Sequence, residues 1–495
     1  MLKAVIFEDE LDFYWEHTFG LEGKLHYLLS FDGEDAGMTE KTHREFVGLQ
    51  PETTHTVSVR TFLNGNPFGQ PEELTVTTAA RRRRIDVTAA PYCAVPDGKT
   101  LSTEAIQRAL DDCPEGGTVY FPAGVYLTGA LNLHSGTELY IDSDATLQGS
   151  ECPEDYLPQI PTRFEGYERL CYRALLNAGT MDHSGPCDCH DITLRGGGRI
   201  RGGGKALCDA VIDRERERLK DYLASIADKM KDYECDITIP GRARPCLVNV
   251  NNTKGFILTR LDVGFGAAWN IHTTYSEDIL ISLTKISSLG VWNGDGWDPD
   301  SSERCVMYGC FFDTQDDAIA IKSGKNPEGN RIGRPCRDIC VFDCEGTQGI
   351  ALGSEMSGGI ENVRIWDCRI YNTVRGLRAK VTRKRGGYIR NVKAAYVTVP
   401  VVSVDSLYTV NDDGEAADTP ALLENFFFEY LHLTGLTRHK IEYPPITVVG
   451  FPEPAYHAKN VTFRHIEIEP LPSGKHHTLN TDFVTGLTME DINFL

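Results

Sequence analysis

Short runs of apolar and β-branched residues recur along most of the chain, and turn residues such as Gly, Asn and Asp separate them. Near the N-terminus, apolar and polar positions alternate within these runs, as they do in the strands of an antiparallel sandwich. The clearest examples are residues 25–31 and 54–62. We therefore predict a small β-sandwich over residues 1–80, which ends before four consecutive arginines at 81–84.

After this boundary the pattern changes. Residues 100–111 combine a Ser/Thr cap with apolar positions at helical spacing, which predicts a helix. The later strand-like runs repeat mostly every ~23 to 36 residues, with no helix expected between successive strands from about residue 250 onward. Parallel strands joined without helices indicate a parallel β-helix over residues 85–495.

One segment interrupts this series of strands. Residues 207–230 are rich in Ala, Leu, Glu, Arg and Lys, which predicts an inserted amphipathic helix. We interpret the insert as a lid or a cleft wall, and a packing insert without a functional role is the alternative.

Bulk composition limits the function further. A chain of 495 residues exceeds one ordinary core, so two domains or a repeat architecture are expected. The net charge of -21 argues against nucleic acid or an anionic membrane as a partner. No run is apolar enough to span a bilayer, and the first ten residues do not form a signal peptide. We therefore expect a cytoplasmic location.

The cysteines do not predict disulfide bonds. Fifteen are scattered without a framework spacing, which favours small buried residues in a reducing compartment. The densest group combines His183 with Cys187, Cys189 and His190, residue types that bind zinc. Because a second spaced pair is missing, we favour a turn that enters a strand and expect no metal there.

Basic residues gather in one stretch of this acidic chain. Residues 374–393 contain no Asp or Glu but hold eight basic residues, among them Arg375, Arg378 and Lys380. Such a run is usually a solvated face. The alternative, a local positive field, would suit an anionic ligand such as a carboxylated sugar.

Two acidic clusters lie near the middle of the chain: Asp295 with Asp298, and the doublet of Asp316 and Asp317. Cleavage of a glycosidic bond requires two carboxyl groups in different protonation states. Equivalent positions on neighbouring coils of a β-helix stack ~4.8 Å apart. We therefore predict that one polar strip runs across successive coils and contains Asp295, Asp316, Asp317, Gln348, Arg378 and Lys380.

The protonation states in such a strip follow from its charges. Carboxylates crowded this closely repel one another, which raises the pKa of at least one of them and leaves a proton available near neutral pH. Arg378 and Lys380 would bind a sugar carboxylate and keep the remaining aspartates charged.

The same residues carry a family resemblance. The chain is similar to glycoside hydrolase family 28, the polygalacturonase family, from about residue 86 to 390. The matching motifs are Asn293–Asp295, Asp298, Asp300, Gln315–Asp317, Arg378–Lys380, Trp269–His272 and Arg244–Pro245. Residues 353–359 and 383–387 resemble the exo-polygalacturonase branch in particular. The resemblance implies an all-β fold, namely a right-handed parallel β-helix of the pectin-lyase-like type.

The resemblance also implies a reaction. It makes Asp316 the general acid and makes Asp295 and Asp317 the water-activating bases of an inverting hydrolysis. It implies neither a metal nor an organic cofactor. The expected substrate is a pectin-derived α-1,4-galacturonide, cleaved one unit at a time from a chain end. The expected substrate-binding residues are Trp269, Asn293, Lys322, Gln348, Glu355, Arg378 and Lys380.

The N-terminal domain resembles a fibronectin type III domain. Trp15 matches the early core tryptophan, and residues 49–51 match the leucine–proline entry into the tyrosine-corner strand. The departure is His55, at the position where that family usually has tyrosine. The sequence leaves open the role of this domain and the oligomeric state.

Three departures from the hydrolase pattern leave alternatives open. Gln348 stands where the family has histidine, Gly294 where it has threonine, and Ala379 where it has isoleucine. Glutamine can position a neighbour but cannot titrate. The alternatives are therefore a hydrolase of rhamnogalacturonan or another decorated uronide, a calcium-dependent lyase, and a non-catalytic sugar-binding protein.

Overall fold

The computed structural model describes residues 1–371, 376–438, 441–470 and 479–495. Arg375, part of the predicted basic stretch, lies outside these residues. The chain divides into two compact units, Met1–Arg83 and Arg84–Leu495. The break falls within the arginine run, and each unit has its own apolar core.

The first unit consists of two antiparallel sheets that share one core. One sheet contains β1 (Lys3–Ile6), β2 (Glu10–Tyr14) and β5 (His43–Val47), and the other contains β4 (Glu34–Thr39), β3 (Leu25–Phe31), β6 (Thr54–Leu63), β7 (Asn66–Pro67) and β8 (Glu72–Thr77). Trp15 is buried and packs edge-on against Tyr27, with 5.2 Å between ring centroids. His55 stacks on Phe31 at 4.9 Å. The resemblance to fibronectin type III stays a prediction.

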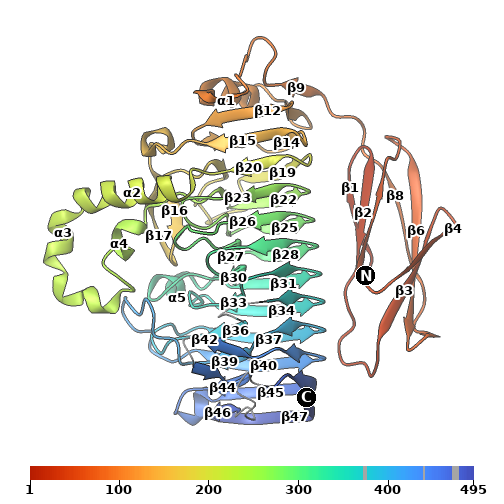
Figure 1. The fold of residues 1–495 in the computed structure, drawn as a ribbon, viewed down its shortest axis with the longest axis vertical. Helices are drawn as coiled ribbons and strands as arrows, with labels where there is room; N and C mark the ends of the chain where they lie inside the picture. Colours follow the sequence, from red (N-terminus) through yellow and green to blue (C-terminus); the bar gives the residue numbers. More distant parts are fainter. Residues whose placement is uncertain (372–375, 439–440, 471–478) are drawn as a thin grey trace. The chain divides into compact units, whose positions relative to one another are not determined.

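The second unit is a parallel β-helix, which confirms the predicted fold class (Figure 1). Its 11-stranded sheet carries the candidate site and consists of β13 (Leu131–Asn132), β18 (Leu176–Ala178), β21 (Val248–Asn251), β24 (Ile271–Thr274), β27 (Trp297–Asp300), β30 (Ile319–Ile321), β33 (Ile350–Leu352), β36 (Leu377–Lys380), β39 (Val402–Asp405), β44 (Ile446–Val449) and β46 (Asn480–Asp482).

A 24-stranded sheet forms the remaining sides of the coils. One row of its strands contains β9 (Arg84–Asp86), β11 (Thr118–Phe121), β14 (Glu138–Ile141), β19 (Cys189–Arg195), β22 (Thr253–Thr259), β25 (Glu277–Ser282), β28 (Glu303–Tyr308), β31 (Cys336–Phe342), β34 (Ile360–Trp366), β37 (Tyr388–Ala395), β40 (Leu422–Glu429), β45 (Ala458–Ile468) and β47 (Val484–Phe494). The second row contains β10 (Asp97–Leu101), β12 (Gly124–Thr128), β15 (Ala145–Gly149), β20 (Arg199–Arg201), β23 (Asp262–Gly264), β26 (Lys285–Ser287), β29 (Phe311–Asp313), β32 (Glu345–Gly346), β35 (Arg369–Ile370), β38 (Thr398–Val399) and β41 (His432–Leu433).

In-register stacking of apolar side chains explains why the coils align. Ile339, Val363, Val392 and Phe426 occupy equivalent positions on successive parallel strands. All four are at most 1% exposed. Because side chains of a strand alternate between the two faces, a one-residue slip would move such a set out of the core. Burial therefore fixes the register that aligns the polar strand ends on neighbouring coils.

Two antiparallel hairpins lie outside the main sheets: β16 (Ile160–Phe164) with β17 (Tyr167–Cys171), and β42 (Leu436–Arg438) with β43 (Ile441–Tyr443). The short helical elements are α1 (Thr103–Asp111), η1 (Pro153–Tyr156), α2 (Gly204–Arg218), α3 (Lys220–Ser225), η2 (Ala227–Asp232), α4 (Thr238–Gly241), α5 (Glu328–Ile332) and η3 (Pro454–Tyr456), where η marks a 3₁₀ helix. Within the residues that the structure describes, no helix is long and apolar enough to cross a membrane.

The helices correct three details of the sequence prediction. The insert predicted as one helix over residues 207–230 is broken into α2, α3 and η2. Because α3 and η2 bury no residue, no packing surface holds a continuous helix there. The coils after residue 250 are not free of helix, since α5 and η3 lie between strands. At the start of α1, the Ser102 hydroxyl does not cap the helix but accepts a bond from the Val95 amide.

Candidate active site

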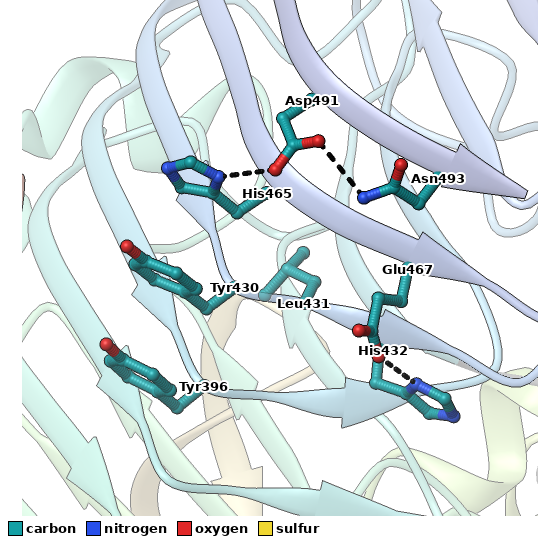
Figure 2. Close-up of a pocket in the computed structure, with 8 residues that line it drawn as sticks. All are labelled: Tyr396, Tyr430, Leu431, His432, His465, Glu467, Asp491 and Asn493. Atoms are coloured by element: carbon teal, nitrogen blue, oxygen red, sulfur yellow. Dashed lines mark hydrogen bonds and ion pairs between the residues drawn. The ribbon is translucent and has the colours of Figure 1, made fainter. Parts of the chain in front are cut away.

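Two hollows of similar size lie on the β-helix unit. One, of about 310 Å³, is lined by the stacked rings of Tyr396, Tyr430 and His465 (Figure 2). Its acidic groups are bonded to histidines, as in the 2.7 Å contact between Asp491 and His465. The other, of about 260 Å³, lies at the 11-stranded sheet and is lined by several carboxylates and cations. We take the second hollow, called here the acidic cavity, as the candidate active site.

The coil register brings the three predicted catalytic aspartates together in the acidic cavity. Trp297 pairs with Ile319, so Asp295 and Asp317 each lie two residues before paired positions of β27 and β30. The backbone reinforces this alignment, because the Gly296 amide donates to the Asp317 carbonyl at 3.0 Å. Carboxylate oxygens of Asp295, Asp316 and Asp317 lie within 4.8 Å of one another.

The turn before β27 explains one departure from the family pattern. A Cβ atom on Gly294 would lie 2.8 Å from the Val291 carbonyl oxygen and 2.9 Å from the Ser288 side chain. A threonine therefore does not fit this turn without a shift. The neighbouring Asn293 lines the acidic cavity and accepts a 2.7 Å hydrogen bond from Arg244.

A buried lysine neutralises part of the acidic cavity. The Lys322 ammonium lies 2.7 Å from Glu355, 3.3 Å from Asp298 and 4.0 Å from Asp295. It also lies 4.4 Å from the centre of the Trp269 ring, which suits a cation–π contact. Burial would lower the pKa of Lys322, but the carboxylates around it raise that pKa well above its ordinary value. Lys322 is therefore a permanent positive charge in the cavity.

The acidic cavity holds at least one proton at neutral pH. Burial, together with the charges of Asp298 and Asp316, raises the pKa of Asp295 well above its ordinary value. Burial also raises the pKa of Asp298 to about 8, despite the opposing effect of Lys322. In contrast, Lys322 lowers the pKa of Glu355 in spite of burial. A cluster that combines protonated and charged carboxyl groups has the requirements of acid–base catalysis.

The predicted arginine and lysine both line the acidic cavity. Lys380 donates to Asp317 at 2.9 Å, and its side chain is only 11% exposed. The side chain of Arg378 is 29% exposed, with a 3.4 Å contact to Ser403 and a 3.8 Å ion pair to Asp405. Lys380 is therefore committed to an aspartate, whereas Arg378 is the cation more open to a sugar carboxylate.

Asp300 lies beneath the acidic cavity instead of lining it. It is fully buried and pairs with Arg163 at 2.7 Å. Burial alone would raise its pKa, but Arg163 and His272 lower it to about 2. His272 is itself fully buried, packs edge-on against Trp269, and has a pKa lowered by burial. Asp300 and His272 thus support the cavity from below.

The structure places Gln348 outside the lining of the acidic cavity. The pairing of Ile319 with Ile350 puts Gln348 in register with Asp317, one coil further along. The other predicted substrate-binding residues do line the cavity: Trp269, Asn293, Lys322, Glu355, Arg378 and Lys380.

Outside the motifs quoted from the sequence, five further residues line the cavity. They are Glu165, Glu234, Tyr408, Val410 and Asn411. Glu165 lies at the tip of the β16–β17 hairpin, Glu234 in the helical insert, and the other three in the loop after β39. None lies in a recognisable motif, and the strand pattern does not indicate that these loops fold over the cavity.

Among the described residues, the acidic trio is the one group with the geometry of metal ligands. Two lysine ammonium groups already lie beside these aspartates. The cysteine–histidine group considered for zinc contacts other residues. There, His183 packs against Tyr275 with 3.9 Å between ring centroids and lies 3.3 Å from Glu168.

Comparisons with known proteins show which family and folds the chain resembles. The model described as glycosyl hydrolases family 28 matches residues 191–413, and one described as rhamnogalacturonase A/epimerase, pectate lyase-like, matches residues 87–150. A probable polygalacturonase of Vitis vinifera is 30% identical over 323 residues, 62% of this chain and 59% of the relative. An exo-poly-alpha-D-galacturonosidase of Dickeya chrysanthemi is 28% identical over 408 residues, 77% of this chain and 67% of the relative. The chain thus spans less than two thirds of the grape relative.

Two solved structures share the fold. A family 28 exopolygalacturonase of Yersinia enterocolitica aligns with a TM-score of 0.79 at 20% identity, over 99% of this chain and 96% of that one. A hyperthermoactive exopolygalacturonase of Thermotoga maritima aligns with a TM-score of 0.67 at 27% identity, over 83% and 91% of the two chains.

Proposed function

We propose that this chain is a member of glycosyl hydrolase family 28 and removes galacturonate units from the ends of pectin-derived α-1,4-galacturonides. One observation carries the proposal. Carboxylates of Asp295, Asp316 and Asp317 lie within 4.8 Å of one another, in a cavity that also holds Arg378 and Lys380. Acids for bond cleavage and a cation for the sugar carboxylate therefore share one small space.

In the proposed reaction, Asp316 gives a proton to the glycosidic oxygen while Asp295 and Asp317 activate water. The raised pKa of Asp295 keeps a proton in the acidic cavity before the substrate binds. Carboxylate oxygens of Asp295 and Asp316 lie within 4.8 Å of each other, so one bridging water would pass this proton to Asp316 when the glycosidic oxygen docks there. Lys322 and Lys380 then stabilise the negative charge that remains on the two bases.

The spacing of the carboxylates makes the stereochemistry a sharp test. Typical inverting glycosidases separate their two carboxyl groups by about 6.5–9.5 Å, and retaining ones by about 5–5.5 Å. The carboxylate oxygens of Asp295, Asp316 and Asp317 lie within 4.8 Å of one another, which is closer to the spacing in retaining enzymes. The family resemblance nevertheless implies inversion, with water held by two aspartates. Proton NMR of the first product should therefore show the β-anomer of galacturonate, and an initial α-anomer would refute the inverting mechanism.

Attack at chain ends is supported by the cavity walls. The hairpin tip, the helical insert and the loop after β39 all contribute residues to the lining, so segments outside the coils border the acidic cavity. The Dickeya and Thermotoga relatives are both described as exo-acting enzymes. A cavity bordered in this way admits one end of a chain and excludes its middle.

Defined oligosaccharides test the proposal. We expect digalacturonate and trigalacturonate to yield free galacturonate from the first time points. Reducing-end-labelled oligomers should shorten by one unit at a time from the unlabelled end. Absence of hydrolysis on all galacturonides would refute the proposed function, and rhamnogalacturonan fragments in the same panel test the alternative substrate. A calcium-dependent rise in ultraviolet absorbance would instead indicate a lyase.

A cytoplasmic location stays part of this proposal, because all fifteen cysteines are free thiols, as expected of a protein in a reducing compartment. Fractionation of the cells that produce the protein would test it. Activity found outside the cells would contradict this part of the proposal.

A further inference from the structure

Three segments far apart in the sequence meet on one side of the acidic cavity. They are the tip of the β16–β17 hairpin, the end of the helical insert around α4, and residues 406–415 of the loop after β39. Figure 1 shows the insert and this loop projecting on the same side of the β-helix. A hydrogen bond joins them directly, because the Glu234 amide donates to the Asn411 side-chain oxygen at 2.9 Å. We call these three segments the wall.

Asp413 lies where the three parts of the wall converge. It is 7% exposed and accepts hydrogen bonds from Arg242 and Lys325. Its ion pair with Arg242 measures 3.1 Å. Arg242 also pairs with Glu165 of the hairpin at 2.7 Å. Lys325 follows β30 and belongs to the β-helix itself. One carboxylate in the loop thus connects the insert, the hairpin and the solenoid.

The charges around Asp413 make this connection difficult to replace. Arg242 and Lys325 are both buried, and Arg385 is fully buried nearby, where it donates to the Asn411 carbonyl. Burial would raise the pKa of Asp413, but Arg242 and Lys325 lower it. Without the Asp413 carboxylate, these buried cations would repel one another, and less negative charge would remain nearby to offset the repulsion.

Close packing also holds the loop. Gly414 has a φ of +90°, and a Cβ atom there would lie 2.6 Å from the Tyr167 hydroxyl and 2.7 Å from the Asn326 carbonyl oxygen. Its neighbour in the sequence is Asp413, so the ion pairs and the close backbone contact secure the same point of the loop. A side chain at position 414 would displace the loop without changing any charge.

We propose that Asp413 is a positioning residue that enforces attack at chain ends, because it holds the wall closed across the acidic cavity. This inference rests on the proposed function and deepens it. Asp413 touches neither the acidic trio nor, on this proposal, the reacting bond. Loss of the connection should therefore open the cavity to the middle of a polymer while the catalytic aspartates stay in place.

The test compares wild-type protein with Asp413→Asn and Gly414→Ala on polygalacturonate. Asp418→Asn serves as a matched control, since Asp418 is exposed in the same loop. Wild type and the control should release monomer with little loss of viscosity. Both wall variants should raise the share of oligomeric products. Asp413→Asn should raise it at least about tenfold, because a buried ion pair contributes more than a factor of ten to an equilibrium, and Gly414→Ala should raise it because the added Cβ displaces the loop. Digalacturonate should still be cleaved.

The outcomes separate the two proposals. Wild type that cleaves no galacturonide refutes the proposed function, and the inference falls with it. If the wall variants are active but release only monomer, and the loss of viscosity per bond cleaved equals that of wild type, the proposed role of Asp413 is refuted. The proposed function is not affected by that result. Melting curves report folding, and if Asp413→Asn does not fold, Gly414→Ala decides the matter because it retains every charge.

Discussion

Lys322 offers a prediction whose magnitude follows from a single distance. Its ammonium lies 4.0 Å from Asp295, an aspartate that must ionise to activate water. At an effective dielectric constant of about 20, two charges 4 Å apart attract by about 4 kcal/mol, or about a thousandfold in the ionisation equilibrium. Lys322→Met should therefore reduce the ionised fraction of Asp295 by about this factor wherever ionisation limits the rate.

The effect has a definite direction on the pH scale. Lys322 lowers the pKa of Asp295 against the raising effect of burial. Its removal raises that pKa further, so the rising limb of kcat/KM should move to higher pH. Below the new limb, activity should fall up to about a thousandfold, and it should recover as the pH rises. The assay is kcat/KM for digalacturonate between pH 4 and pH 9.

Two controls separate this effect from loss of folding. Lys322→Arg keeps the charge and should keep the pH profile. Lys322→Met leaves Glu355 buried without its 2.7 Å partner, which should cost about 3–5 kcal/mol of stability. Combining it with Glu355→Gln should restore most of that stability without restoring the pH profile. A uniform loss of activity at every pH, with no shift of the limb, would refute the electrostatic role of Lys322.

Three further predictions concern the cation for the sugar, the support beneath the cavity and metal ions. Arg378→Gln should raise KM for galacturonides about 10- to 100-fold with kcat little changed, because a charged hydrogen bond contributes about 1.5–3 kcal/mol; an equal effect on methyl-esterified substrate would contradict a carboxylate contact. Asp300 has a pKa lowered to about 2, so its stabilising effect of about 2 kcal/mol is present above pH 4 and lost as the pH falls through 2. Acid-unfolding curves of Asp300→Asn should lack this component, although the variant also loses stability near neutral pH because Arg163 stays buried; an unchanged curve would refute the assignment. EDTA should leave the hydrolysis rate unchanged because two lysines already neutralise the aspartates, and a loss restored by calcium would favour the lyase.

The β-helix and its aspartates could be predicted from local patterns. Apolar runs at the coil period give the strands, and Asp295, Asp316 and Asp317 follow because each precedes such a run. The close approach of acidic residues on neighbouring coils could also be predicted, because it depends only on the number of residues per coil. These predictions work because parallel stacking turns sequence spacing into spatial proximity.

Other features depend on contacts that no local pattern contains. Asp298 and Asp300 lie on β27, as the motif indicated, but both are fully buried, and their partners come from elsewhere in the chain. Arg163, the partner of Asp300, is 137 positions away in a hairpin outside the coils. Arg242 and Glu165 are separated by 77 positions. The wall could not be predicted because loops of this kind are fixed by non-local ion pairs, and not by periodicity.

The placement of Gln348 shows the same limit. Motif alignment put it at the family histidine, and the register places it one coil beyond Asp317. Whether a side chain at that point enters the cavity depends on turn geometry, which the spacing does not contain. In the structure the half-buried Gln348 does not line the acidic cavity. Its effect on sugar preference therefore has to act through neighbouring residues.

The central claim is that the three aspartates cleave the sugar chain, and Asp316→Asn tests it most directly. Trigalacturonate binding, measured by calorimetry, and hydrolysis should be followed on the same preparation. Removal of a general acid should lower kcat by about 10²- to 10⁴-fold, whereas the dissociation constant should stay within a few-fold of that of wild type. Wild-type turnover by Asp316→Asn, or tight binding without turnover by the unmutated protein, would contradict the account.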